Sequence, residues 1–270
     1  MPEQRAMLEI RSARKVFNAG TVNEKVALDG LSLTLNAGDF VTVIGGNGAG
    51  KSTMLNAVSG VWLVDDGQIL IDGQDVTRLP EYKRASLLGR VFQDPMVGTA
   101  ATMGIDENMA LAYRRGARRG LAWSITPQEK ELYRQKLASL GLGLEERMTT
   151  KVGLLSGGQR QAITLLMATL KKPKLLLLDE HTAALDPKTA AKVLELSDQI
   201  VREQNLTTLM ITHNMKDAIK FGNRLIMMHE GHIIYDVQGE EKKSLHVSDL
   251  LAKFEQASDG EFANDRMLLS

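Results

Sequence analysis

Residues 41–52, VTVIGGNGAGKS, join an apolar run to a glycine-rich turn. The last eight residues have the spacing G-x-x-x-x-G-K-[ST], which arises by chance in a chain of this length roughly once in a hundred cases. Glycines let successive backbone N–H groups point at phosphate oxygens, and the helix expected to follow adds its positive N-terminal end. Lys51 can reach the terminal phosphates, and the Ser52 hydroxyl can ligate Mg²⁺. The segment predicts a phosphate-binding loop between a buried strand and a helix.

A second motif lies at residues 175–186, LLLLDEHTAALD, where two acidic residues follow an apolar run. Four leucines predict a buried parallel strand, whose carboxyl end lies at the sheet edge where α/β folds bind ligands. Asp179 is therefore expected to hold Mg²⁺, usually through water, and Glu180 to orient and polarise the attacking water. The alternative is a pair of acids that only caps a strand end.

The segment LLSGGQRQ, residues 154–161, precedes a clear helical pattern. Ser156, Gly157 and Gly158 would form a second anion-binding helix N-terminus, with a hydroxyl and exposed N–H groups. The chain thus carries two phosphate-binding elements. Either both grip one nucleotide, or the second serves a nucleotide held by another copy.

The order of the remaining patterns predicts the fold class. Residues 7–44 alternate short strand-like runs with turns, which indicates a small antiparallel sheet leading into a buried strand, and residues 96–170 are mostly helical in pattern. After Pro173, strands alternate with helices, which is typical of a parallel sheet covered on both faces. Turns at Asp72-Gly73 and Glu230-Gly231 are expected to join two further strand pairs.

The pentapeptide Leu155–Gln159, LSGGQ, matches the signature of ATP-binding cassette (ABC) transporters, and the chain resembles their nucleotide-binding subunits from residue 7 to about 240. The resemblance implies an α/β P-loop NTPase core, with a mostly parallel sheet, an N-terminal antiparallel β-subdomain and an inserted helical subdomain. One ABC domain would span 1–240, with its core at 7–95 and 165–240, the helical subdomain at 96–164 and an amphipathic extension at 241–270. In this family two cassettes dimerise head to tail, and each signature closes over the partner's nucleotide.

Further positions match the family one by one. Gln93, in VFQDP, corresponds to the glutamine that senses Mg²⁺ and links the core to the helical subdomain. Asp186 corresponds to the aspartate that communicates across the dimer, and His213, which ends TTLMITH, to the histidine that contacts the γ-phosphate and the attacking water. Phe17 stands where the family stacks an aromatic ring on adenine, with Val26 beside it.

The resemblance therefore implies ATP and Mg²⁺ as cofactors and an ATP hydrolase as the activity. The expected catalytic residues are Glu180, His213, Gln93 and Lys51, and the expected metal ligands are Ser52, Gln93 and Asp179. The expected nucleotide-binding residues are Phe17, Gly45, Asn47, Gly48, Gly50, Lys51, Ser52, Thr53, Ser156, Gly157, Gly158, Gln159 and Asp186.

The amino-acid composition limits the classes of partner that the protein is expected to bind. The 270 residues carry 33 basic and 33 acidic side chains, so no global field indicates a nucleic-acid partner. Cysteine is absent, which excludes disulfides and thiolate metal sites. No signal-peptide core or membrane-spanning stretch is present. The subunit is expected to work at the cytoplasmic face of the membrane with separate permease subunits, a second copy of itself and an extracytoplasmic solute-binding protein.

Import is favoured over export, because many exporters fuse the cassette to their membrane domain and TTKVGL lacks the glutamate-bearing motif common in exporters. The segment GQDVTRLPEYKRA, residues 73–85, resembles the cassettes of amino-acid-type importers, including a group linked to aromatic amino acids. The alternatives are a split exporter ATPase and a non-transport ABC ATPase of DNA repair or chromosome maintenance, although no coiled coil or zinc module separates the motifs. A third alternative, a regulatory cassette that binds ATP without hydrolysis, is opposed by Glu180 and His213.

Two features stand apart from the family pattern. His181 occupies a position where the family usually has proline, which would confine Glu180 to extended backbone angles. Histidine is expected to leave that restraint to the surrounding packing and to loosen the path to Asp186. The run RRGARRG, residues 114–120, is expected to be a solvated loop or to face lipid headgroups or a partner, and the surface near residues 96–108 to receive a helix of the permease.

Overall fold

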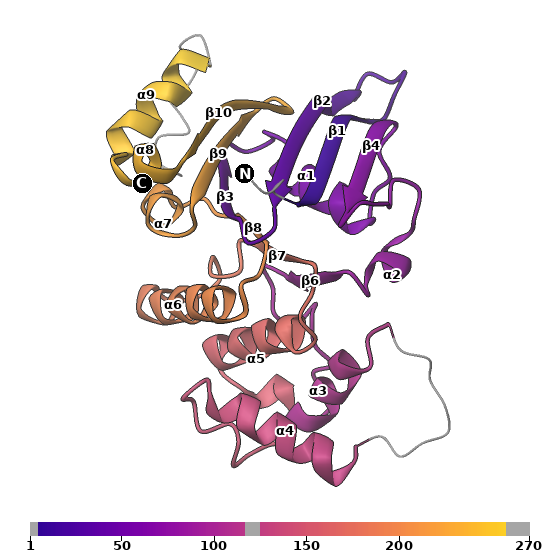
Figure 1. Cartoon of the computed structure of the whole chain (residues 1–270), viewed down its shortest axis with the longest axis vertical. Coiled ribbons are helices and arrows are strands. Elements are labelled where there is room, and N and C mark those ends of the chain that lie inside the picture. The colour runs from indigo at the N-terminus through magenta and orange to yellow at the C-terminus, as the bar shows by residue number, and fades with distance from the viewer. Residues whose placement is uncertain (1–4, 117–124, 258–270) are drawn as a thin grey trace. The chain divides into compact units, whose positions relative to one another are not determined.

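The structure is a computed structural model that describes residues 5–116 and 125–257. The chain divides into two compact units, which we call the first unit (Met1–Arg84 and Asn205–Ser270) and the second unit (Ala85–Gln204) (Figure 1). The domain boundaries expected from sequence stay a prediction. Most of the 114–120 run and the last residues of the C-terminal extension lie outside the described residues.

The first unit contains the expected antiparallel sheet. Its strands lie in the order β2-β1-β4-β5, and all neighbouring pairs are antiparallel. Asp72 and Gly73 both have positive φ, 52° and 78°, as the two-residue turn between β4 and β5 requires. The strands are β1 (Ala6–Phe17), β2 (Lys25–Asn36), β4 (Asp66–Ile71) and β5 (Gln74–Asp75).

The other strands of the first unit follow the order β10-β9-β3-β8. Strand β3 is buried along its whole length and pairs in parallel with both β8 and β9. Helices α7, α8 and α9 lie beside β9 and β10 (Figure 1), and Leu250 and Phe254 of α9 join the core formed with β3 and β9. The elements are β3 (Phe40–Gly45), β8 (Thr208–Ile211), α7 (Met215–Lys220), β9 (Arg224–His229), β10 (His232–Gln238), α8 (Gly239–Lys243) and α9 (Val247–Ala257).

Helix α1 (Lys51–Ser59) begins directly after the glycine-rich turn, and a buried arginine holds its other end. Arg84, the last residue of α2 (Glu81–Arg84), is fully buried and donates to the carbonyl oxygens of Ala57 and Val58 at 2.7 and 2.9 Å. A cation is favourable at the C-terminal end of a helix, where carbonyl groups lack helical partners. Burial nevertheless lowers the pKa of Arg84 to about 10.

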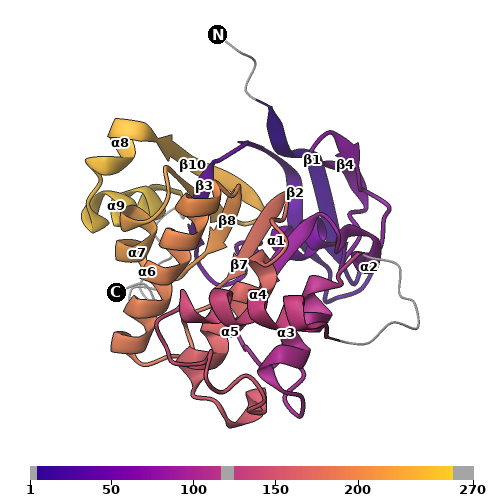
Figure 2. The same ribbon diagram turned by 60° about the horizontal axis from the view of Figure 1, so that its bottom comes forward.

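The second unit combines two parallel strands with a group of helices, and Figure 2 shows α3, α4 and α5 of this group together. Strands β6 (Leu88–Val91) and β7 (Leu175–Asp179) pair in parallel. Helices α3 (Ile105–Tyr113), α4 (Pro127–Ala138) and α5 (Gly157–Thr169) share one apolar core around Met109, Tyr133 and Ile163. The 3₁₀ helix η1 (Val152–Leu154) and α6 (Pro187–Gln204) complete the unit. The helices and β7 match the patterns read from the sequence, whereas β6 was not predicted.

Of the helices in the described ranges, none has the length and apolar character needed to cross a lipid bilayer.

We predict that Gly50→Ala lowers the free energy of unfolding by at least about 2 kcal/mol. Gly50 has φ of 99°, and an added Cβ would lie 2.5 Å from the Ala27 carbonyl oxygen. Gly73→Ala is the matched control, because Gly73 has φ of 78° and nothing within 4 Å of an added Cβ. It should cost only about 1 kcal/mol. Urea unfolding measures both, and equal losses would contradict the steric explanation.

Candidate nucleotide-binding site

The phosphate loop lies in the first unit between β3 and α1. Lys51 is only 5% exposed, and its ammonium donates to the carbonyl oxygens of Gly45 and Gly46 at 2.6 and 3.0 Å. Gly48 and Gly50 have φ of 81° and 99°, which favours glycine at both positions. The loop is thus folded around the ammonium of its own lysine.

The polar residues of the loop differ in exposure. Asn47, Gly48 and Ser52 are exposed, and Thr53 is half-buried in the first turn of α1. Gly50 caps α1 without a side-chain hydrogen bond to its first turn. The N-terminal end of α1 therefore offers backbone donors and the Ser52 hydroxyl from one place, which suits an anion with an associated cation.

The expected aromatic residue lies close to this loop. Phe17 ends β1 and pairs in register with Lys25, whose ammonium lies 2.9 Å from the place where a Cβ on Gly48 would stand. The Trp62 ring meets the Phe17 ring edge-on, with centroids 4.9 Å apart. Lys25 and Trp62 were not expected at this site, since their positions carry no motif.

The parallel register also places His213. Val43 of β3 pairs with Ile211 of β8, and Gly45 and His213 each follow two residues later. The Thr212 N–H donates to the Val43 carbonyl at 3.1 Å, so this alignment continues past the end of β8. His213 is half-buried and lies level with Gly45 at the carboxyl edge of the strands.

The same register argument applies in the second unit. Val91 of β6 pairs with Leu178 of β7, and Gln93 and Glu180 each follow two residues later. The structure thus brings Gln93, Asp179 and Glu180 to one strand edge of this unit. Phe17, the phosphate loop and His213 belong to the first unit.

Asp179 has an arginine partner that the sequence did not predict. Its carboxylate accepts from the Arg90 guanidinium at 3.0 Å, and both side chains are less than a fifth exposed. Arg90 also lies over the Phe92 ring, 4.6 Å from its centroid. An arginine within the apolar run SLLGRVFQ was a signal for such a buried pair.

The loop after β7 is tightly held. Glu180 has φ of 47°, and the Ala183 N–H donates to the Glu180 carbonyl at 3.0 Å, which closes a turn with His181 in its second position. His181 is only 2% exposed, and its Nε2 lies 2.9 Å from the Ser197 hydroxyl of α6. Burial lowers the pKa of His181 to about 4. These contacts oppose the expectation that histidine loosens this loop.

The signature lies at the start of α5, beside the start of α6. The Ser156 hydroxyl accepts from the Gln159 N–H at 3.3 Å, and the Gln159 side chain accepts from the Ser156 N–H at 3.2 Å, so the two form a capping box. A Cβ on Gly158 would stand 2.2 Å from the Thr189 methyl carbon. Asp186 accepts from the Thr189 N–H, and hydrogen bonds from the Thr189 side chain and backbone hold the pKa of Asp186 below its usual range.

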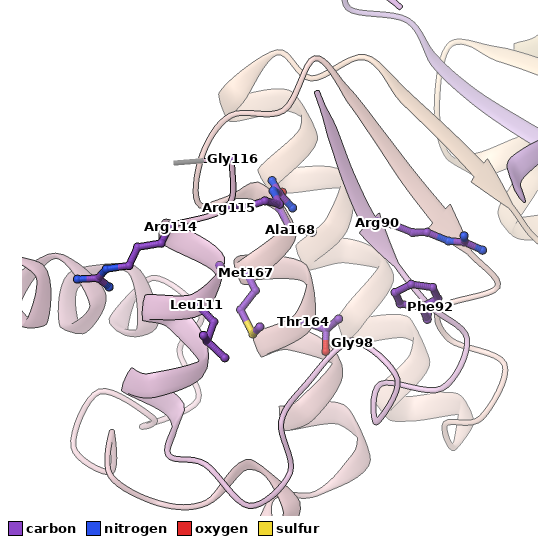
Figure 3. A pocket seen from close by; sticks show the side chains of 11 residues that line it. Arg90, Phe92, Gly98, Leu111, Arg114, Arg115, Gly116, Thr164, Met167 and Ala168 are labelled. Carbon is purple, nitrogen blue, oxygen red and sulfur yellow. The ribbon is translucent and has the colours of Figure 1, made fainter. Parts of the chain in front are cut away.

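A pocket of about 430 Å³ opens between β6, α3 and α5 of the second unit (Figure 3). Arg90 and Phe92 line one side and Leu111 the other. Arg114 points away from it and pairs with Glu129 at 2.9 Å. Arg115 donates to the Ala168 carbonyl at 3.2 Å, and burial lowers the pKa of its guanidinium.

Comparisons with known proteins agree with this arrangement. Residues 28–183 match the family model described as ABC transporter. The chain is 46% identical over 251 residues to the tyrosine transport ATP-binding protein of Clostridioides difficile (strain R20291), which covers 93% of this chain and 100% of that relative. It is 33% identical to the spermidine/putrescine import ATP-binding protein PotA of Haemophilus influenzae (strain 86-028NP), over 87% of this chain and 59% of that relative.

Solved structures lead to the same family. A dimeric ATP-binding cassette in a post-hydrolysis state bound to ADP and Pi matches with a TM-score of 0.73 and 27% identity, over 86% of this chain and 98% of that one. The ADP conformation of another ABC transporter cassette matches with a TM-score of 0.75 and 26% identity, over 92% of this chain and 98% of that one.

The chain therefore belongs to the ABC transporter family. Within it, the protein is an importer-type nucleotide-binding subunit, an ATP hydrolase with a P-loop NTPase fold.

We predict that Arg90→Met lowers the free energy of unfolding by about 3 kcal/mol, because it leaves the largely buried Asp179 carboxylate without its cation. Arg202→Met is the control, since Arg202 pairs with Asp198 on α6 while 73% exposed. That loss should stay below about 1 kcal/mol. Urea unfolding of both variants checks the difference, and similar losses would show that the Arg90 pair is not special.

Proposed function

We propose that the subunit binds ATP with Mg²⁺ through the residues described above. Lys51 and the N–H groups of the phosphate loop contact the phosphates, and Phe17 stacks on the adenine. Ser52, Asp179 and Gln93 hold the metal, while Glu180 and His213 act on the attacking water. The donor set fits Mg²⁺, a hard cation held by oxygen atoms of few protein side chains together with substrate phosphates. Among the described residues no group of three or more His, Asp or Glu side chains lies together as a metal site of their own.

In this proposal the ATPase powers uptake of tyrosine or a closely related aromatic amino acid. The observation that carries it is the 46% identity to a tyrosine transport ATP-binding protein over the whole length of that relative. PotA and the methionine import ATP-binding protein MetN 2 of Enterococcus faecalis (strain ATCC 700802 / V583) are 33% and 34% identical.

The working assembly would be a head-to-tail pair of these subunits on two permease subunits at the cytoplasmic face of the membrane, with an extracytoplasmic solute-binding protein. The capping-box signature supports the pairing, because its exposed Ser156 and Gly157 begin a helix whose positive end favours a phosphate. ATP binding would close the pair, and hydrolysis would reopen it.

The arginine-lined pocket in Figure 3 is the surface that we propose for the permease. Arg115 has a half-buried guanidinium, which donates to the Ala168 carbonyl oxygen. The following residues 117–124, ARRGLAWS, contain no acidic side chain that could serve as its counter-ion. A cytoplasmic segment of the permease that carries a carboxylate would complement this charge.

Transport is tested with the complex purified from membranes and placed in proteoliposomes with ATP inside the compartment that the cassettes face. We expect ATP-dependent uptake of labelled tyrosine, which excess unlabelled tyrosine suppresses and excess methionine or spermidine does not. Glu180→Gln should lower ATP hydrolysis by at least about 100-fold and abolish uptake. Uptake of spermidine or methionine instead would overturn the substrate, and recovery of nucleic acid without a permease would overturn transport.

Arg115→Glu should weaken co-purification of the permease by about tenfold or more, because it replaces the complementary charge with a repelling one. ATP binding by the isolated subunit should not change. Arg134→Glu is the matched control, since Arg134 is an exposed arginine of α4 outside the pocket. Equal retention of the permease by both variants would remove the pocket from docking.

A further inference from the structure

His181 stands where related chains usually have proline, and the structure shows what takes over from proline. The imidazole is buried against α6, with Nε2 2.9 Å from the Ser197 hydroxyl oxygen. Ser197 is itself 1% exposed, and its hydroxyl donates its single hydrogen to the Val193 carbonyl at 2.8 Å. The Ser197 oxygen must therefore accept, so the His181 Nε2–H donates to it. The ring is fixed in one tautomer and tied to the helix.

The residue before His181 needs such a restraint. Glu180 has φ of 47°, a left-handed conformation that costs a side-chain-bearing residue roughly 1–2 kcal/mol and persists only where the surroundings enforce it. Its carbonyl accepts from the Ala183 N–H, and His181 is the second residue of the turn so formed. A proline there would drive Glu180 toward extended angles and away from the observed φ. The anchor in this chain has to be a side chain.

We propose that the hydrogen bond from His181 to Ser197 holds Glu180 in its working position. His181 and Ser197 are thus positioning residues for ATP hydrolysis. The inference rests on the role of Glu180 proposed above. The bond joins the turn to α6, an 18-residue helix, almost three turns after its start at Pro187. Because the Ser197 hydroxyl also bonds to the Val193 carbonyl of its own helix, the Ser197 side chain cannot rotate freely. The turn that contains His181 is therefore held rigidly against α6.

The alternative is that His181 merely fills a buried space. In that case, loss of the bond would lower stability and leave the chemical step intact. A small displacement of a catalytic group, in contrast, lowers the rate of the chemical step far more than substrate binding. The two explanations therefore differ in how they divide an effect between kcat and KM.

The experiment uses the transporter complex with Ser197→Ala, which removes the acceptor. We expect kcat for ATP hydrolysis to fall about tenfold, with KM for ATP changed less than about twofold. Ser197→Thr keeps the hydroxyl oxygen and should restore most of the rate. Thr169→Val is the matched control, because it removes a buried hydroxyl that, among the described residues, bonds only to its own helix α5, at Leu165 and Leu166, and should leave kcat unchanged.

A double-mutant cycle with Glu180→Gln completes the test. Once the carboxylate is gone its position no longer matters, so Ser197→Ala should have no further effect on the residual single-turnover rate. An undiminished kcat in Ser197→Ala, or the same fractional loss in the Glu180→Gln background, would overturn the inference while leaving Glu180 in its role. Full turnover by Glu180→Gln would instead overturn the proposed role of Glu180, and this inference with it.

If Ser197→Ala does not fold, Ser197→Cys provides a second variant, because it retains the shape of the side chain but is a weaker acceptor. It should give an intermediate kcat, and an unchanged kcat would again overturn the inference.

Discussion

Two glycines of the phosphate loop lie so close to neighbouring carbonyl groups that no side chain could stand there. A Cβ on Gly45 would be 2.4 Å from the Met228 oxygen of β9, and one on Gly50 would be 2.5 Å from the Ala27 oxygen of β2. The loop is thus shaped from both sides by strands that are distant in sequence. Its own lysine folds inward onto the Gly45 carbonyl, and Arg84 secures the far end of α1. The nucleotide binding that we propose for the first unit depends on this close packing.

Parallel strand pairing then sets the level of the other candidate residues. In the first unit the register of β3 and β8 places His213 level with Gly45 along the strands. In the second unit the register of β6 and β7 places Gln93 level with Glu180. Two charged pairs lie within the second unit, where Asp179 faces Arg90 and Arg114 faces Glu129. In the proposed site, Mg²⁺ would compete with the Arg90 guanidinium for the Asp179 carboxylate.

Much of the fold was predictable because its signals are local. The glycine spacing, the leucine run before Asp179, the capping serine of the signature and the turns at Asp72-Gly73 and Glu230-Gly231 each act over a few neighbouring residues. Arg90, Lys25 and Ser197 were not predictable as site residues. Ser197 looks like an ordinary small polar residue in an amphipathic helix, and only the fold shows that it faces His181 across 16 positions of chain. The same is true of Lys25, which reaches the phosphate loop through strand pairing with Phe17.

By itself, the sequence determined the kind of chemistry: a phosphate loop, two acids at a strand end, a serine-capped helix and the family to which they point. Those features survive as short motifs because backbone conformation and side-chain chemistry within a few residues suffice to specify them. Only the tertiary structure decided how the motifs are held, through Arg90 on Asp179, Arg84 on α1 and Ser197 on His181. Such contacts depend on strand register and helix packing, and these are settled when residues far apart in the chain share one core.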